Sequence, residues 1–424
     1  MEKRIENQKL GIGYLLKEHS SGLKIYLMKI KGVSSTRAIF GTKYGSIDTC
    51  FSKNGGEAIS VPEGIAHFLE HKLFESEGVD AFELFSKTGA YSNAYTSFDR
   101  TCYLFNCTEN LEENLKILLG FVQSPYFSKE TVEKEQGIIG QEIQMYLDAP
   151  DWRVLFNLLE ALYSENPVRI DIAGTRESIS KISAELLYSC YETFYNPSNM
   201  FLVLAGDFDE QKVLEIVDSE LKPSEPIKIT RHIPSEQGGV LKEYCEQALA
   251  VAKPMFMLGF KVDTVGYENA KRRIAMELGL EVAFGKSSSV FKTLRDDGLI
   301  TNPLDFEYFC TRDTAVAIIG GESDDPKAVK DRILSELHRL TQDGIDSELF
   351  EAAKKTAYGE RLVAFDKVEG AVSRMVESAV TGEDAFSELE ALQTITESDV
   401  IDCLKLLTKE NHALSVITPN AKGE

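Results

Sequence analysis

The residues of this chain best suited to chemistry lie in one pentapeptide, His67-Phe68-Leu69-Glu70-His71. A helix advances 100° per residue, so His67 and His71 would lie one turn apart on one face, with Glu70 beside them. Two imidazole nitrogens can bind zinc, and a neighbouring carboxylate can act as a base toward water. The pentapeptide is therefore a candidate for metal-assisted hydrolysis. The alternative is an ordinary helix with structural histidines.

The surrounding residues predict that the pentapeptide is helical. Ser60 can cap a helix, Glu63 completes a capping box three residues later, and Pro62 is tolerated in a first turn. We therefore expect a helix that begins one or two turns before His67. The pattern H-x-x-E-H is the inverted form of the commoner zinc-peptidase motif.

A zinc site needs at least a third ligand, which is often a carboxylate. A second helix is predicted over residues 129–147, and it contains Glu135 and Glu142. These two residues are seven apart, or about two turns, and so share a face of that helix. The spacing alone does not distinguish Glu142 from a solvated helix carboxylate.

The inverted motif, followed by Glu142 71 residues after His71, with Glu135 seven residues earlier, resembles the pitrilysin family of zinc peptidases. That family includes insulin-degrading enzyme and the mitochondrial processing peptidases. The resemblance implies that His67, His71 and Glu142 hold zinc. It implies that Glu70 is the general base and that Glu135 is a carboxylate supporting the catalytic site.

The resemblance extends over essentially the whole chain and also predicts its architecture. It implies two homologous α+β domains, each a mostly antiparallel sheet with helices packed on one face, and metal in the first domain only. At 424 residues the chain exceeds the usual size of one core. Pro223, Pro226, Pro234 and Gly238-Gly239 mark a linker over 223–239. The predicted domains are residues 1–222 and 240–424.

The predicted strands 91–97 and 100–105 suggest how a substrate would bind. In the resembling family, the segment matching Asn93-Ala94-Tyr95-Thr96 is an edge strand to which the substrate adds as one more strand. An open edge presents unpaired N–H and C=O groups that hold an extended peptide through its backbone. Asn93 and Ala94 are therefore predicted to bind substrate; the alternative is a plain hairpin. The implied activity is that of a zinc metalloendopeptidase cleaving short or unfolded peptides.

Arg295 is a further predicted substrate-binding residue, but its expected companion is missing. Resembling proteins have an arginine here and a tyrosine seven residues later, which bind the substrate carbonyl or the oxyanion. This chain has Asn302 at that position. The alternative for Arg295 is a charge on a helix surface.

The missing tyrosine indicates a second subunit. In bacterial two-subunit members of the family, one chain has the zinc motif and its partner supplies the arginine–tyrosine pair. We expect this chain to be the catalytic subunit of a heterodimer with a homologous chain lacking the motif, or of a homodimer. Two alternatives stay open: a non-catalytic peptide-binding subunit, and a scaffold stabilised by zinc.

Composition excludes several other classes of protein. A net charge of −22 argues against nucleic acid or an anionic membrane as partner. No stretch approaches the 18 or so apolar residues of a membrane span, and the first residues show no signal-peptide pattern. Seven scattered cysteines without C-x-x-C predict free thiols rather than a disulfide framework, and hence a cytoplasmic protein.

Overall fold

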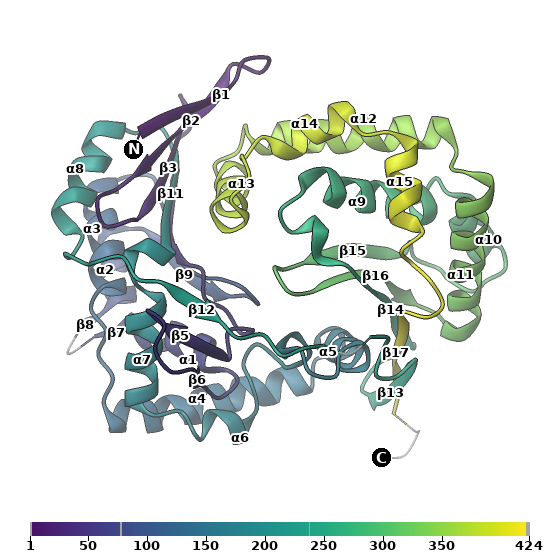
Figure 1. Ribbon diagram of the computed structural model, residues 1–424, viewed down its shortest axis with the longest axis horizontal. Helices are drawn as coiled ribbons and strands as arrows, with labels where there is room; N and C mark the ends of the chain where they lie inside the picture. Colours follow the sequence, from purple (N-terminus) through teal and green to yellow (C-terminus); the bar gives the residue numbers. More distant parts are fainter. Residues whose placement is uncertain (1, 77–78, 237, 421–424) are drawn as a thin grey trace. The chain divides into compact units, whose positions relative to one another are not determined.

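The protein is described by a computed structural model for residues 2–76, 79–236 and 238–420. The chain forms two compact units (Figure 1). The first contains the residues up to 143, together with 171–232 and 363–386. The second contains 144–170, 233–362 and the residues from 387 on. Each has a mostly antiparallel sheet with packed helices, which confirms the predicted α+β class.

The main sheet of the first unit has, within the described residues, the strand order β1-β2-β3-β11-β4-β10-β9. β11 runs parallel to β3, and the other neighbours are antiparallel. Central β11 is buried along its whole length, whereas edge strand β9 alternates between exposed and half-buried residues. The strands are β1 (Glu2–Asn7), β2 (Ile12–Glu18), β3 (Lys24–Lys29), β4 (Thr36–Thr42), β9 (Tyr91–Thr96), β10 (Thr101–Cys107) and β11 (Met200–Gly206).

Smaller elements and helices complete this unit. The short strands are β5 (Cys50–Lys53), β6 (Ile59–Ser60) and β12 (Ile229–Arg231) in one small sheet, and β7 (Glu75–Ser76) with β8 (Val79–Asp80) in another. The helices are α1 (Ile65–Phe74), α2 (Ala81–Thr88), α3 (Leu111–Val122), α4 (Lys129–Leu147), α6 (Arg176–Ile179), α7 (Ala184–Phe194), α8 (Glu210–Glu220), α13 (Val368–Thr381) and the 3₁₀ turn η2 (Pro197–Asn199).

The two faces of this sheet are covered by helices from different parts of the chain. On one face Tyr103 of β10 contacts Phe74 of α1, with ring centroids 5.8 Å apart. Side chains alternate along a strand, so Leu104 points to the other face. Paired residues of β4, β11 and β3 place Tyr26 on that same face, where it stacks on Tyr14. Phe386, just after α13, packs on Tyr14 at 5.7 Å.

The second unit repeats this arrangement with five strands among its described residues, in the order β13-β17-β14-β16-β15. β13 is parallel to β17, and the remaining pairs are antiparallel. The strands are β13 (Tyr244–Leu249), β14 (Met255–Val262), β15 (Asp305–Cys310), β16 (Ala315–Glu322) and β17 (His412–Pro419). The helices are α5 (Pro150–Leu162), α9 (Ala270–Phe284), α10 (Ser289–Asp296), α11 (Pro326–Asp343), α12 (Ser347–Ala364), α14 (Ser387–Thr394) and α15 (Glu397–Leu404), with 3₁₀ turns η1 (Pro167–Arg169) and η3 (Thr264–Gly266).

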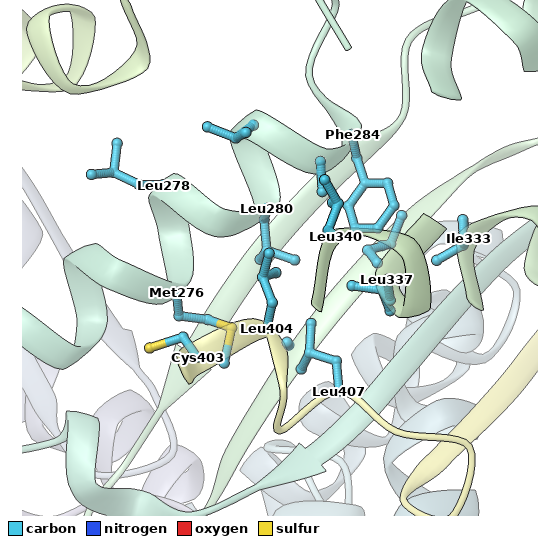
Figure 2. Packing of buried hydrophobic residues seen from close by; sticks show 14 of the residues in the cluster. Met276, Leu278, Leu280, Phe284, Ile333, Leu337, Leu340, Cys403, Leu404 and Leu407 are labelled. Carbon is cyan, nitrogen blue, oxygen red and sulfur yellow. The ribbon is translucent and has the colours of Figure 1, made fainter. Parts of the chain in front are cut away.

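The core of the second unit lies between one face of its sheet and α9, α11 and α15. Figure 2 shows Met276 and Leu280 of α9 with Leu337 of α11 and Leu404 of α15 in this cluster. On the opposite face, a Cβ at Gly259 of β14 would lie 2.7 Å from Leu158 of α5. α5 therefore packs directly against the backbone of that strand.

The prediction of helices on one face thus holds for most helices, and one further helix covers the opposite face of each sheet. α5 comes between α4 and α7 in the chain but belongs to the second unit, and α13 comes between α12 and α15 but belongs to the first. Residues 144–170, which lie in the predicted first domain, therefore belong to the second unit. Residues 363–386, which lie in the predicted second domain, belong to the first unit. In addition, β12 lies inside the predicted linker, and it pairs with β5 of the first unit.

The predicted cap of the motif helix is wrong. α1 begins at Ile65, and its N-cap is Gly64, without a side-chain cap. Ser60 lies in β6, and its hydroxyl contacts Cys50 Sγ at 3.5 Å. Gly64 has φ of 85°, and a Cβ there would lie 2.4 Å from the carbonyl oxygen of Ala173. Close backbone approach, possible only for glycine, sets the start of α1.

Two predictions from composition can be compared with the fold. All seven cysteines are free thiols, as their odd number and spacing predicted. Across residues 2–76, 79–236 and 238–420, every helix is too short or too polar to cross a membrane.

Candidate metal centre

The fold brings together the histidines of α1 and a carboxylate of α4. His67 Nε2 lies 3.7 Å from Glu142 Oε1, and His71 Nε2 lies 3.5 Å from Glu142 Oε2. One ligand atom from each of the three residues lies within 4.8 Å of the others, and within the described chain no other such group occurs. Ligand atoms about 2.0–2.2 Å from a tetrahedral zinc are about 3.3–3.6 Å apart. The donor set and its spacing therefore fit zinc.

Glu135 lies two turns before Glu142 on α4 and contacts the second histidine. His71 Nδ1 and Glu135 Oε1 are 3.0 Å apart, and the Glu135 side chain is buried. A hydrogen bond at Nδ1 fixes the ring orientation and leaves Nε2 free to act as a ligand. Glu135 thus contacts the ring of His71 and is not one of the three grouped residues.

The two imidazoles have different electrostatic surroundings. Burial, and next the charge of His71, lower the pKa of His67 to about 3, so this ring is neutral at neutral pH. Burial alone would lower the pKa of His71 as well. The hydrogen bond to Glu135 and the carboxylates of Glu70 and Glu142 outweigh that effect and raise it. A histidine that binds metal must be deprotonated at the ligating nitrogen, and His67 meets that condition over a wide pH range.

Glu70 is buried next to these residues, and its partner is a threonine on the edge strand. Thr96 Oγ1 donates a hydrogen bond of 2.6 Å to Glu70 Oε2. Burial raises the pKa of Glu70, and the hydrogen bond from Thr96 opposes part of that rise. Thr96 lies in the predicted substrate strand, but its contact with Glu70 is not predictable from the sequence. Its only signal was its place at the end of that segment.

β9 is an open edge of the sheet in the described part of the chain, because it pairs only with β10. Ser97 N donates to Arg100 O, so these two residues form a hydrogen-bonded pair. Hydrogen-bonded and non-hydrogen-bonded pairs alternate along an antiparallel ladder, so the N–H of Ala94 points away from β10. The Asn93 side chain accepts a hydrogen bond from this amide at 2.9 Å. Ala94 therefore presents its backbone groups at the open edge of the strand that contacts Glu70, whereas the backbone of Asn93, paired with Leu104, faces β10.

Arg295 lies in the second unit, on α10. Its guanidinium is 3.8 Å from Asp296 and lies over the ring of Phe291, and more than half of the side chain is exposed. Asn302, at the position where resembling proteins have a tyrosine, lies in the segment between α10 and β15. The substrate-binding role of Arg295 stays a prediction.

Comparison with known proteins shows to which family this chain belongs. The profile described as "Insulinase (Peptidase family M16)" matches residues 60–176, and that described as "Peptidase M16 inactive domain" matches 181–357. An "Uncharacterized zinc protease YmfH" of Bacillus subtilis is 43% identical over 407 residues, covering 94% of this chain and 95% of the relative. The chain belongs to peptidase family M16, the pitrilysin family.

Solved structures extend the similarity to M16 proteins over the whole fold. A putative M16-like peptidase from Alicyclobacillus acidocaldarius shares 34% identity with a TM-score of 0.93, covering 98% of this chain and 100% of that chain. A protease from Helicobacter pylori has the same fold, with a TM-score of 0.81 at 17% identity over 96% of this chain and 100% of that chain. The residues of the metal centre all lie within the first M16 match, 60–176.

Proposed function

We propose that this M16 protein is a zinc metalloendopeptidase that cleaves short or unfolded peptides bound in an extended conformation. The observation on which the proposal depends is the grouping of His67, His71 and Glu142 beside Glu70. Glu70 is in turn hydrogen-bonded to the open edge strand. The name of the Bacillus subtilis relative, a zinc protease, supports the proposal.

The residues of the chain divide the reaction between them. His67, His71 and Glu142 would hold zinc, which when bound supplies a Lewis acid and lowers the pKa of a water molecule. Glu135 holds the His71 ring in the orientation that presents Nε2. Glu70 would accept a proton from water and deliver it to the leaving amine. Thr96 holds Oε2 of Glu70, and the other carboxylate oxygen makes no hydrogen bond to the described chain.

The substrate backbone would pair with β9. The outward N–H of Ala94 would be released from the Asn93 side chain and would donate to a peptide carbonyl. Because Thr96 of this strand touches Glu70, a peptide in register with β9 has its backbone next to the general base. Main-chain pairing predicts broad side-chain tolerance and a preference for unfolded substrates.

The proposal is tested with a mixed peptide library incubated with and without a chelator, alongside measurement of bound zinc. We expect cleavage that the chelator abolishes and added zinc restores. Glu142→Gln should weaken zinc binding, whereas Gln141→Glu, an exposed neighbour, should not. Full zinc content in the Glu142 variant would remove that residue from the ligand set. A zinc-loaded protein that binds peptides but cleaves none would favour the non-catalytic alternative.

We further propose that the protein works as one subunit of a dimer, with a homologous chain or a second copy. The support is the absence of a tyrosine seven residues after Arg295. We expect low activity from the isolated chain and a gain when a partner co-purified from the native source is added. Full turnover by the monomer would refute this part of the proposal.

A further inference from the structure

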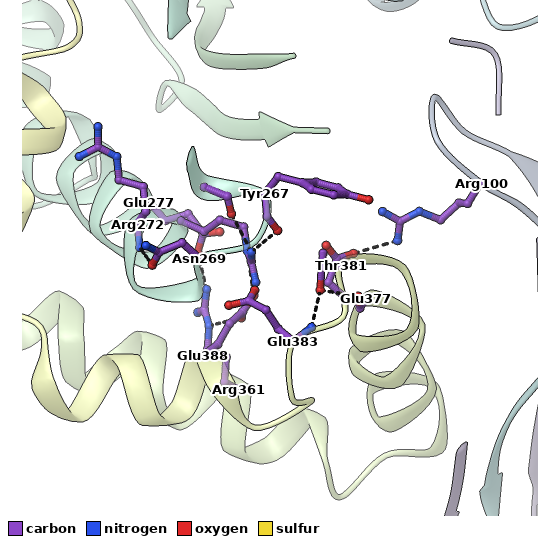
Figure 3. Close-up of polar contacts among 12 residues, drawn as sticks. Arg100, Tyr267, Asn269, Arg272, Glu277, Arg361, Glu377, Thr381, Glu383 and Glu388 are labelled. Atoms are coloured by element: carbon purple, nitrogen blue, oxygen red, sulfur yellow. Dashed lines mark hydrogen bonds and ion pairs between the residues drawn. The ribbon is translucent and has the colours of Figure 1, made fainter. Parts of the chain in front are cut away.

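Helix α13 is joined to the hairpin of β9 and β10 by a partly buried ion pair. Arg100 Nη1 donates to Glu377 Oε2 at 2.8 Å (Figure 3). Arg100 Nε donates to Asp99 Oδ1 at 2.7 Å. The side chains of Arg100, Glu377 and Asp99 are 15%, 33% and 2% exposed. The first unit therefore has a specific attachment between its edge hairpin and a helix 277 residues further along the chain.

The hairpin is held at a second place by main-chain contacts. Ser46 N and Ile47 N donate to the carbonyl oxygens of Ser97 and Phe98, at 3.1 and 3.0 Å. A Cβ at Gly45 would lie 2.4 Å from the carbonyl of Phe98, so the two backbones are in direct contact. These contacts hold the tip, and Arg100 joins the start of β10 to α13.

The attachment leads to the candidate general base in a few contacts. Thr101, next to Arg100, donates to the carbonyl oxygen of Tyr44 at 2.9 Å. Its hydroxyl lies 3.4 Å from Thr96 Oγ1, which donates to Glu70 Oε2. A shift of Arg100 would therefore displace both the substrate edge of β9 and the hydroxyl that holds Glu70.

Contacts at the end of α13 fix the last turns of the helix, where Glu377 lies. Thr381 Oγ1 donates to the Glu377 carbonyl oxygen at 2.9 Å and accepts from Glu383 N at 3.3 Å (Figure 3). A carboxylate in the last turns of a helix is disfavoured by the helix dipole, and a guanidinium there is favoured. The Arg100 charge offsets the unfavourable position of Glu377, so each side chain stabilises the other.

We propose that Glu377 is a positioning residue for peptide binding: through Arg100 it fixes β9 before a substrate strand adds to it. This inference depends on the proposed peptidase function. An edge strand has no neighbour on its open side, so its order must come from its attachments. A strand that is already ordered loses less conformational entropy on binding. Loss of the attachment should therefore weaken peptide binding more than it slows the chemical step.

The test compares Glu377→Gln with Glu369→Gln, an exposed glutamate on the same helix. Glu377→Gln leaves the Arg100–Asp99 pair intact, so it avoids stranding a buried charge. With an internally quenched peptide that the wild type cleaves, we expect KM to rise roughly three- to tenfold with kcat changed less than about twofold. Glu369→Gln should match the wild type, and Glu377→Asp, which keeps the charge, should fall between the two.

Hydrogen exchange gives a readout that does not depend on activity. In Glu377→Gln, exchange over residues 91–96 should be faster than in the wild type and in Glu369→Gln, with zinc content unchanged. Equal KM and equal exchange in the two variants would overturn the inference, as would a rise in KM explained wholly by lost zinc or unfolded protein. Absent cleavage by the wild type, with the co-purified partner added, would instead refute the proposed function.

Discussion

Five strands of the first unit, β3-β11-β4-β10-β9, are ordered like the five-stranded sheet of the second unit, but different chemical groups lie on the helices at matching places. In the first, α1 and α4 bring two histidines and a glutamate together. In the second, the helices at the same places in the order are α9 and α12. There Arg361 of α12 binds Glu277 of α9 and also Glu388 of α14, the latter at 2.8 Å (Figure 3).

This difference shows two ways in which one fold can provide partners for carboxylates between corresponding helices, α1 with α4 in the first unit and α9 with α12 in the second. The second unit uses a guanidinium that belongs to the chain, so its carboxylates are satisfied as soon as it folds. The first unit instead has two imidazoles beside carboxylates, which is the donor set for a divalent cation. The candidate metal centre is therefore a property of side chains, not of the shared architecture.

The largest predicted effect is at Glu70. We expect Glu70→Gln to lower kcat by about a thousandfold, because the amide cannot take up a proton. Zinc content should be unchanged, since Glu70 lies outside the ligand group. Glu57→Gln, an exposed residue before α1, is the matched control. Loss of zinc in the Glu70 variant would show that this residue is a ligand.

Replacing Arg361 tests the neutralising role on the other side of the comparison. Arg361→Ala removes a partner from the carboxylates of Glu277 and Glu388, while Glu277 stays partly solvated and Glu388 keeps Arg273 at 3.8 Å, so we expect the free energy of unfolding to fall by about 2 kcal/mol. Denaturant unfolding measures this. Arg339→Ala, which breaks an (i, i+3) pair on a helix surface, should cost less than about 1 kcal/mol. Equal losses would contradict the comparison.

Glu135 provides a smaller effect within the metal centre. Glu135→Gln weakens the hold on His71 Nδ1, so we expect zinc affinity to fall roughly ten- to a hundredfold while the ligand set stays intact. Competition with a chromogenic chelator measures this. Glu133→Gln, an exposed neighbour on α4, should have no effect. If both variants bind zinc like the wild type, Glu135 has no role in orienting His71.

A further effect concerns the contacts that attach residues 144–170 to the rest of the second unit. The Glu236 carboxylate accepts hydrogen bonds from the backbone amides of Ser164, Glu165 and Asn166, and from Lys261. Burial alone would raise the pKa of Glu236, but these bonds lower it to about 2. Because the folded-state pKa lies below the usual 4.5, the stabilisation is present above pH 4.5 and is lost as pH falls toward 2.

We therefore expect Glu236→Gln to cost roughly 2 kcal/mol at pH 7, measured by denaturant unfolding, and the difference from the wild type to shrink toward pH 2. Glu165→Gln alters an exposed side chain beside the same loop and should not change stability. A difference that is independent of pH would assign the effect to packing rather than to charge.

Sequence patterns predicted the elements with strong local signals. The predicted helix 129–147 matches α4 in extent, because the spacing of apolar residues and the nearby breakers are local properties. The start of α1 was not predictable in this way. It depends on Gly64 meeting the backbone of Ala173, more than 100 residues away in the chain.

The sequence alone determined the motif: helical spacing places His67, Glu70 and His71 on one side of α1, and it places Glu135 and Glu142 on one side of α4. Only the tertiary structure decided that the two helices bring these groups within 3.7 Å, that Thr96 holds Glu70, and that α5 and α13 are exchanged between units. The reason is physical. Helical periodicity arises within a few residues, whereas contacts between distant segments depend on which faces remain to be buried when the sheets form.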